Sequence, residues 1–277
     1  MKNRKIRRER RKDIQAEKRP CILLKLIYRT YLIDLYIHLS VPTTMLTVLS
    51  IQSLDRTLTL ALNGSASLYL DHLAWLSTKT VTWLPLVLVL IFVLLRNNDW
   101  RRTLSVVLFL GIAIFLADQL ASGICKPFFA RFRPSQNPEL LHAVDVVRGY
   151  RGGAYGFFSS HAANTMAVAT FLTLLVRSSS WGCYLYSWVV LNCWTRVYLG
   201  VHYVGDLLTG LLWGGIVGWL TYLVWQNFFG PKRSSRGMQG DPNIQTLGGY
   251  AVIDVYILIN SLILTYLFIA IAAFIIV

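Results

Sequence analysis

Residues 103–125 read TLSVVLFLGIAIFLADQLASGIC, an apolar stretch whose only formal charge is Asp118. Because a helix needs about twenty apolar residues to cross a bilayer, this stretch predicts a membrane-spanning helix. Leu35–Leu54 is also apolar, but it contains His38 and Pro42 and is therefore the weakest further candidate. The remaining candidate spans are Thr80–Leu95, His161–Val176, Ser178–Thr195, Leu207–Gly230 and Val255–Val277.

The composition agrees with a chain that lies mostly in lipid. Hydrophobic residues make up 55% of the 277 residues and charged residues only 14%, whereas a soluble domain carries about a quarter charged residues. The mean hydropathy is +0.51. These values exclude a disordered chain and a disulfide-stapled secreted module, and they argue against a soluble enzyme. We expect an all-α fold, a polytopic transmembrane helical bundle of five to seven spans.

Basic residues are concentrated at the start of the chain. The net charge is +14, and about half of it lies in MKNRKIRRERRKDIQAEKRP, residues 1–20. Such a run could bind nucleic acid, but the positive-inside rule favours a cytoplasmic tail beside anionic lipid. We therefore expect a tail at 1–34, a membrane core at 35–230, a loop at 231–250 and a further transmembrane helix at 251–277, with no nucleic-acid partner.

The unusual polar groups of the predicted core gather in three short segments at the ends of spans. The first, KPFFARFRP (126–134), follows the span at 103–125, and the second, FSSH (158–161), begins the next span. The third, TRVYLGVHYVGD (195–206), links the two spans after that. If every candidate crosses the bilayer, all three segments emerge at the same membrane face.

Several of these side chains suit a phosphate group. Lys126, Arg133 and Arg196 are three fixed cations that can bind the non-bridging oxygens of a phosphate and the charge that develops on them. Ser159 and the free backbone N–H groups at the start of the span at His161 add neutral donors and the positive pole of a helix. Together these groups predict a phosphate-binding site.

The remaining polar residues suit phosphoryl transfer. An imidazole nitrogen attacks phosphorus readily if the other ring nitrogen is held, so His202 is the candidate nucleophile. Asp206 lies one helical turn later, where it can hold that imidazole. His161 remains as the general acid that protonates the departing group. No paired acids lie at ligand spacing among these segments, so we expect neither a metal nor another cofactor.

Each of these residues taken alone has a simpler structural interpretation. A basic residue at a helix end is usually an interfacial anchor, a Ser before a helix is usually an N-cap, and His202 with Asp206 can be a structural pair. Their joint occurrence favours an enzyme. The alternative is a non-catalytic membrane protein that binds or moves phospholipids with the same pocket, but such a protein needs neither a nucleophile nor an acid.

The three segments resemble the motifs of the type-2 phosphatidic acid phosphatase and vanadium haloperoxidase superfamily. Its pattern is Lys-x6-Arg-Pro, then Pro-Ser-Gly-His, then Ser-Arg-x5-His-x3-Asp. The first and third motifs match here in spacing, with Thr195 in place of Ser. In the second, Ser159 and His161 are kept, while Phe158 replaces Pro and Ser160 replaces Gly.

The resemblance covers roughly Leu46–Gly230 and implies a bundle of five or six transmembrane helices with the phosphate site at the extracytoplasmic face of the cell (inner) membrane. It implies metal-independent hydrolysis of a lipid phosphate or diphosphate ester through a phosphohistidine intermediate. Candidate substrates are an isoprenoid diphosphate, lipid A, phosphatidylglycerol phosphate and phosphatidic acid. The implied catalytic residues are His202, His161 and Asp206, and the implied substrate-binding residues are Lys126, Arg133, Ser159, Ser160 and Arg196.

Two further charged residues and a row of glycines need separate interpretations. Asp118 is about 12 Å from Lys126 along an unbroken helix, so we expect it to bond a neighbouring helix. Arg131 is a candidate contact for a lipid head group. Small residues in the span at Leu207–Gly230 suit close helix packing, and they are Gly210, Gly214, Gly215 and Gly218.

The orientation of the membrane core can be tested by cysteine labelling. If the tail is cytoplasmic and Leu35–Leu54 spans, Gln136 lies outside the cell. If that segment lies flat on the membrane instead, the chain crosses the bilayer one time fewer and Gln136 lies inside. We expect Gln136→Cys, with the native cysteines replaced, to react with an impermeant maleimide in intact cells. Arg177→Cys, predicted at the opposite face, is the matched control. Labelling of Gln136→Cys only after the inner face is opened would contradict the outward assignment.

Overall fold

The structure is a computed structural model that describes residues 43–230 and 244–276. The chain divides into two units, residues 1–54 and 55–277, and the contacts discussed below all lie within the second, to which the helix at Thr43–Leu62 belongs only from Asp55 onward. The predicted tail, residues 35–42 of the candidate span Leu35–Leu54 and residues 231–243 of the predicted loop lie outside the described residues. Within the described ranges the chain forms helices and turns and no β-strand, as predicted.

The helices follow one another through mostly short connections. In chain order they are α2 (Thr43–Leu62), α3 (Leu68–Ser77), α4 (Leu84–Asn97), α5 (Trp100–Asp118), α6 (Lys126–Phe129), α7 (Ser160–Val176), α8 (Ser179–Tyr198), α9 (Val204–Phe229) and α10 (Val252–Ile276). Single 3₁₀ turns lie at Thr80–Trp83, Pro134–Gln136, Pro138–Leu140 and Val147–Gly149. A π-helical segment, Gln119–Cys125, joins α5 to α6.

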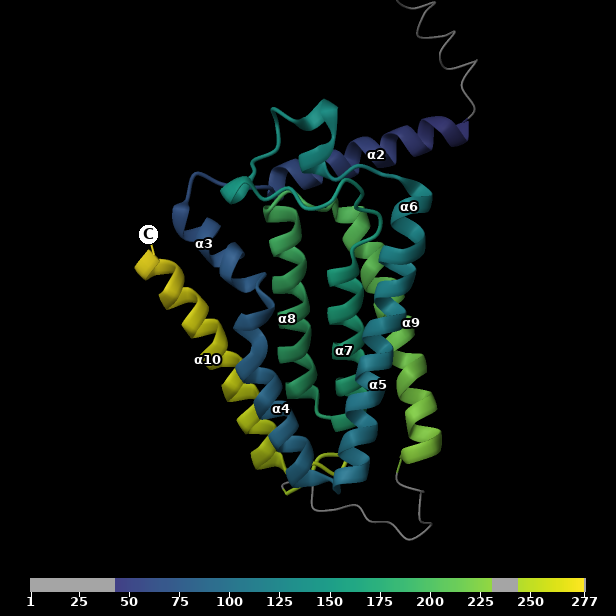
Figure 1. Cartoon of the computed structure of the whole chain (residues 1–277), viewed down its shortest axis with the longest axis vertical. Coiled ribbons are helices and arrows are strands. Elements are labelled where there is room, and N and C mark those ends of the chain that lie inside the picture. The colour runs from purple at the N-terminus through teal and green to yellow at the C-terminus, as the bar shows by residue number, and fades with distance from the viewer. Residues whose placement is uncertain (1–42, 231–243, 277) are drawn as a thin grey trace, which may run out of the picture. The chain divides into compact units, whose positions relative to one another are not determined.

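Short polar turns reverse the chain at one end of the bundle. Asp99 caps α5 because its Oδ1 accepts the N–H of Arg102 over 2.7 Å. Ser178 caps α8 because its Oγ accepts the N–H of Trp181 over 3.4 Å. Arg177 ends α7 in the left-handed conformation, with a φ of 53°. These tight turns make α4 and α5, and likewise α7 and α8, antiparallel neighbours (Figure 1).

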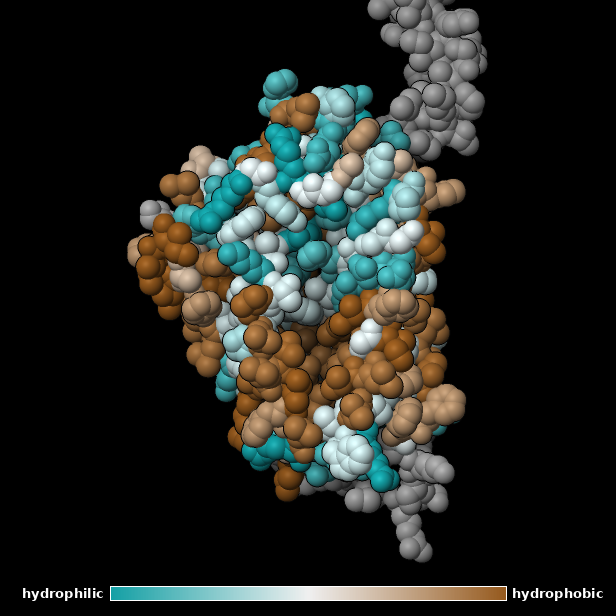
Figure 2. Space-filling model, in the orientation of Figure 1, coloured by the Kyte–Doolittle hydropathy of each residue, from teal (hydrophilic) through white to brown (hydrophobic). Residues whose placement is uncertain are grey.

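The surface of these helices is that of a membrane protein. Among the residues that the structure describes, four segments are long and apolar enough to span a bilayer: Thr80–Asn97, Trp100–Phe129, Val204–Phe229 and Val252–Ile276. Large hydrophobic side chains are exposed along α4, α5, α9 and α10. Figure 2 shows them gathered over the middle and lower part of one face, with hydrophilic side chains above. The predicted polytopic helical bundle is confirmed.

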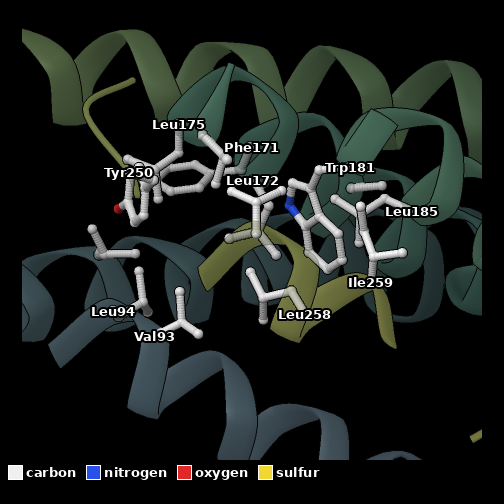
Figure 3. Packing of buried hydrophobic residues seen from close by; sticks show 14 of the residues in the cluster. Val93, Leu94, Phe171, Leu172, Leu175, Trp181, Leu185, Tyr250, Leu258 and Ile259 are labelled. Carbon is white, nitrogen blue, oxygen red and sulfur yellow. The ribbon is translucent and has the colours of Figure 1, made fainter. Parts of the chain in front are cut away.

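The core lies where α4, α7, α8 and α10 meet. Figure 3 shows its members: Val93 and Leu94 of α4, Phe171, Leu172 and Leu175 of α7, Trp181 and Leu185 of α8, and Leu258 and Ile259 of α10. In lipid, such helices associate through close packing, because the surrounding acyl chains are as apolar as the side chains. The C-terminal helix α10 is therefore part of the packed bundle.

The three segments with candidate catalytic residues lie at the same end of the second unit. α6 ends there, α7 begins there, and the turn between α8 and α9 lies there (Figure 1). This placement follows from the antiparallel order of α5, α7, α8 and α9, because alternate connections meet at the same end. The three segments therefore share one end of the bundle, and the opposite end carries the turns at Asp99 and Arg177. That this end is one membrane face stays a prediction.

Glycines let α9 approach α7 closely. A Cβ atom at Gly214 would collide with the carbonyl oxygen of Ala163, and one at Gly218 with the carbonyl oxygen of Ala167. Gly215 differs, because the nearest atom to its Cβ position would be Cε of Met166 at 3.7 Å. A Cβ atom at Gly210 would lie 2.6 Å from the carbonyl oxygen of Ser159. The predicted close packing is therefore confirmed for Gly210, Gly214 and Gly218 and is absent at Gly215.

We expect Gly218→Ala to destabilise the protein by about 1–3 kcal/mol, because the added methyl group forces two helix backbones apart. Gly215→Ala is the matched control. Its methyl group meets only ordinary contacts, and alanine is the better helix former, so this variant should be as stable as the wild type or more so. Thermal unfolding in detergent measures both. Equal melting temperatures for the two variants would show that backbone contact between α7 and α9 is not limiting.

Candidate active site

Lys126 follows an unusual helical segment. Beyond Asp118 the helix continues as the π-helix Gln119–Cys125, a form often found at functional sites. Lys126 Nζ donates to Ser122 Oγ over 2.9 Å, and Ser122 Oγ donates to Asp118 Oδ1 over 3.2 Å. The expectation that Asp118 bonds a neighbouring helix is therefore wrong. Its partner is one turn further along its own helix, and through Ser122 it is linked to Lys126.

The start of α7 lies beside Lys126. Lys126 Nζ donates to Ser160 Oγ over 3.0 Å. Ser159 is fully buried and caps α7, because its Oγ accepts the N–H of Ala162 over 3.4 Å. The backbone N–H of Ser159 donates to the carbonyl oxygen of Asp206 over 3.1 Å, which joins the starts of α7 and α9. Ser159 thus has a capping role, and Ser160, in place of the family's Gly, contacts the cation. Their part in phosphate binding stays a prediction.

Arg133 approaches His202 from the loop after α6. Its Nη1 lies 3.3 Å from His202 Nε2 and donates to the carbonyl oxygen of Val201 over 3.1 Å. Its Nε donates to the carbonyl oxygen of Tyr155 over 3.1 Å. Burial lowers the pKa of Arg133, but a guanidinium remains charged at neutral pH. These bonds hold a cation directly beside the candidate nucleophile.

Arg196 is a buried cation near the end of α8, and only 3% of its surface is exposed. Its Nε donates to Thr195 Oγ1 over 3.2 Å, so the threonine that replaces the family's Ser still places a hydroxyl beside the guanidinium. Its Nη2 has no hydrogen-bond partner among the described residues. An unsatisfied buried donor costs free energy. An anion such as phosphate can satisfy it.

His202 and Asp206 face each other and are almost completely buried. His202 Nδ1 lies 3.5 Å from Asp206 Oδ2, which is long for a hydrogen bond. Bonds between catalytic groups are often long until substrate binds. Burial lowers the pKa of His202 to about 4, against the opposing effect of Asp206 and with a smaller contribution from Arg133 and Lys126. The imidazole is therefore neutral at pH 7, as a nucleophile must be.

His161 is the second residue of α7 and is exposed. It is close enough to Arg196, His202, Lys126 and Arg133 for their charges to act on it. The structure therefore places His161 in the same cluster as the other predicted residues. All the predicted site residues meet at this end of the bundle.

Two charged residues in the cluster were not predicted as part of it. Arg131 donates from Nη1 to Asp206 Oδ1 and from Nη2 to Asp55 Oδ2, both over 2.7 Å. Burial by itself lowers the pKa of Arg131, but Asp206 and Asp55 outweigh it and the pKa is raised. The proposed lipid contact of Arg131 is therefore replaced by ion pairs within the protein. The position of Arg131 inside the first motif was a signal, whereas nothing in the sequence indicated Asp55.

Gly156 was also missed. A Cβ atom there would lie 3.1 Å from Arg133 Cγ, 3.3 Å from Asp206 Oδ2 and 3.5 Å from His202 Nδ1. The N–H of Gly156 donates to the carbonyl oxygen of Arg131 over 2.9 Å. The loop backbone therefore packs directly against the histidine–aspartate pair, and a side chain at this position would crowd it.

The described residues contain no group of three or more His, Cys, Asp or Glu side chains placed to hold a metal ion. Positive charge at the site is supplied by Lys126, Arg133 and Arg196. Cations and a helix N-terminus around a buried neutral imidazole can bind an oxyanion and stabilise charge that develops on it. The arrangement suits nucleophilic attack on a phosphate group.

Comparison with known proteins identifies the family. Residues 102–229 match the model of the PAP2 superfamily. A lipid A 4′-phosphatase of Bacteroides thetaiotaomicron is 38% identical over 176 residues, which are 63% of this chain and 78% of that protein. The chain belongs to the PAP2 superfamily. It is therefore a phosphoric ester hydrolase, a membrane lipid phosphatase, as its three motifs predicted.

A second relative has the same name as the first. A lipid A 4′-phosphatase of Porphyromonas gingivalis is 36% identical over 175 residues, 63% of this chain and 74% of that protein. Two crystal structures are similar at lower identity. A PAP2-type phosphatidylglycerolphosphate phosphatase from Bacillus subtilis is 21% identical with a TM-score of 0.48. The match covers 76% of this chain and 97% of the Bacillus chain. LpxE of Aquifex aeolicus is 24% identical with a TM-score of 0.45, and the match covers 61% of this chain and 94% of LpxE.

Proposed function

We propose that this PAP2 protein removes a phosphate group from lipid A, at the 4′ position. Among the substrates that the motifs allowed, lipid A is favoured because the two curated relatives, at 38% and 36% identity, are both lipid A 4′-phosphatases. The observation that carries the reaction itself is the buried His202–Asp206 pair beside the cations Arg133 and Lys126. A protein that only bound or moved phospholipids would need the cations but not this pair.

The reaction has two steps. Nε2 of His202 attacks phosphorus, and an N–P bond forms while the P–O bond to the lipid breaks. His161 gives a proton to the departing oxygen, which leaves as a lipid hydroxyl group. Water then attacks the phosphohistidine, His161 takes a proton from that water, and the N–P bond breaks to release inorganic phosphate. Asp206 holds Nδ1–H and stabilises the imidazolium that forms in the first step.

The cations make a metal ion unnecessary in this mechanism. Arg133 and Arg196 bind the non-bridging oxygens of the phosphate, Lys126 neutralises charge on the same group, and the first N–H groups of α7 add donors. Ser159 and Ser160 lie at that helix start and complete the substrate-binding set. Fixed cations in a buried site can stabilise the developing charge as divalent ions do elsewhere.

The site is proposed to face outward from the inner membrane. At the end of the bundle opposite the site, Arg96, Arg101, Arg102 and Arg177 lie at or near the turns between helices. Lys and Arg are concentrated in cytoplasmic loops, so this end is assigned to the cytoplasm. Lipid A phosphate groups presented at the outer surface of the inner membrane would then reach the site laterally from the bilayer.

We expect purified wild-type protein to release phosphate from lipid A, and mass spectrometry to show loss of the 4′ phosphate. His202→Ala should reduce the rate by a factor on the order of a thousand or more, because the nucleophile is gone. Asp206→Asn should cost one to two orders of magnitude less, because Asp206 orients rather than attacks. His142→Ala is the matched control, since His142 is exposed in the loop after α6 and has no assigned role.

Two results would change the proposal. Faster turnover of an isoprenoid diphosphate, phosphatidylglycerol phosphate or phosphatidic acid in the same assay would replace lipid A as the substrate. Wild-type activity in His202→Ala would remove the mechanism.

We also expect activity in excess EDTA and strong inhibition by vanadate. Vanadate takes up the five-coordinate geometry of the transition state and can bond to His202 while the cations hold its oxygens. Transition-state analogues bind more tightly than substrates by a factor of about a hundred or more. Phosphate release is measured with EDTA alone, with vanadate alone and with neither. Loss of activity in EDTA that Mg²⁺ restores would show that the reaction depends on a metal.

A further inference from the structure

The first helix of the second unit contributes a buried acid to the active-site end. Asp55 lies on α2, and its side chain is 12% exposed. Oδ1 of Asp55 accepts the N–H of Gly205 over 2.8 Å, and Oδ2 accepts Nη2 of Arg131 over 2.7 Å. One carboxylate therefore holds both the first turn of α9 and the guanidinium of Arg131. Asp55 itself lies outside the three motif segments, whereas Arg131 lies in the first and Gly205 in the third.

Arg131 carries this link to the catalytic pair. Its second terminal nitrogen, Nη1, donates to Asp206 Oδ1 over 2.7 Å, and its guanidinium lies over the ring of Tyr203, 4.1 Å from the centroid. A planar guanidinium stacked on an aromatic ring can hold two carboxylates in a fixed geometry, whereas the point charge of a lysine cannot. Arg131 thus links Asp55 to Asp206, because the two terminal nitrogens of one planar guanidinium bond the two carboxylates.

The Asp206 carboxylate has its orientation fixed on several sides. Oδ1 accepts a hydrogen bond from Arg131, and Oδ2 accepts one from the N–H of Tyr203 over 3.0 Å. Oδ2 also lies 3.5 Å from Nδ1 of His202. If Arg131 were absent, Oδ1 would lose its cation, and the carboxylate would be held less firmly, through the bond from the N–H of Tyr203 to Oδ2. The ion pairs therefore determine which oxygen is presented to the imidazole.

We propose that Asp55 and Arg131 form a positioning pair that fixes the Asp206 carboxylate and the start of α9, and thereby sets the orientation and protonation of His202. This inference rests on the proposed function, in which His202 is the nucleophile. Neither residue touches the phosphate in this assignment. Both act through Asp206, so they are positioning residues.

The charges of the pair act on His202 with opposite signs. The positive charge of Arg131 weakens the electrostatic stabilisation that Asp206 gives to a protonated His202. The negative charge of Asp55 in turn partly cancels the charge of Arg131. Neutralising Arg131 should therefore stabilise the imidazolium and raise the pKa of His202, whereas neutralising Asp55 should lower it. Neither substitution removes the other charged or titratable groups that interact with His202, which are Asp206, Arg133, Lys126 and His161.

The test compares Arg131→Gln, Asp55→Asn and the double variant with wild type. In each single variant we expect kcat for lipid A to fall about 10- to 100-fold, as when the outer partners of metal-binding histidines are removed, with KM little changed. The acid limb of kcat/KM should move up by about one pH unit in Arg131→Gln and should move down in Asp55→Asn. The double variant should lose little more than Arg131→Gln, because Asp55 acts through Arg131.

A neighbouring ion pair provides the matched control. Arg56, the next residue on α2, pairs with Glu139 over 2.6 Å, and both side chains are exposed, at 42% and 66%. An exposed pair of this kind contributes little to stability. Arg56→Gln should therefore leave kcat and the acid limb unchanged. Equal losses in Arg56→Gln and Arg131→Gln would show a general effect of α2 and would overturn the proposal.

A measurement without turnover separates this inference from the proposed function. The pKa of His202 can be read by NMR of histidine-labelled protein, with its signal assigned from the spectrum of His202→Gln. Opposite shifts in Arg131→Gln and Asp55→Asn would support the positioning pair even if lipid A proved not to be the substrate. Shifts in the same direction, or wild-type kcat and pKa in Arg131→Gln, would overturn the pair while leaving the phosphatase assignment intact.

Discussion

The carboxylate of Asp206 is the centre on which the active-site end of this protein depends. It lies at the first turn of α9, is fully buried, and faces His202 while it accepts bonds from Arg131 and from the backbone N–H of Tyr203. The backbone carbonyl of the same residue accepts the N–H of Ser159 at the start of α7. A buried charge is tolerated only when it is paired and hydrogen-bonded, so the folded protein needs these partners of Asp206 to be in place together.

The helical bundle makes that arrangement possible because it brings several helix ends to one place. α7 and α9 approach each other closely at Gly214 and Gly218, where carbonyl groups of Ala163 and Ala167 occupy the space of a side chain. The close contact brings the N-terminus of α7 alongside that of α9. Two helix N-termini with their free N–H groups then lie beside a set of cations, which gives an anion-binding site at the boundary of the apolar bundle.

Much of the fold and the site could be predicted from the sequence. Apolar stretches of membrane-spanning length fix where helices form, since lipid offers the backbone no alternative hydrogen-bond partner. The motif residues Lys126, Arg133, Arg196, His202 and Asp206 follow from fixed spacings next to those helices. The prediction went wrong where local structure departed from a regular helix. At Gln119–Cys125 the π-helix intervenes, and Ser122 links Asp118 to Lys126.

The sequence by itself determined the apolar helices, their order and the chemical identity of the candidate catalytic groups, because those properties depend on local composition and short spacing. Only the tertiary structure decided that Arg131 pairs with Asp55 and Asp206, that Gly156 packs against the His202–Asp206 pair, and that Ser159 caps α7 while Ser160 contacts Lys126. Asp55 and Asp206 are far apart in the chain. Their shared arginine depends on the final packing of helices and loops, which no spacing in the sequence records.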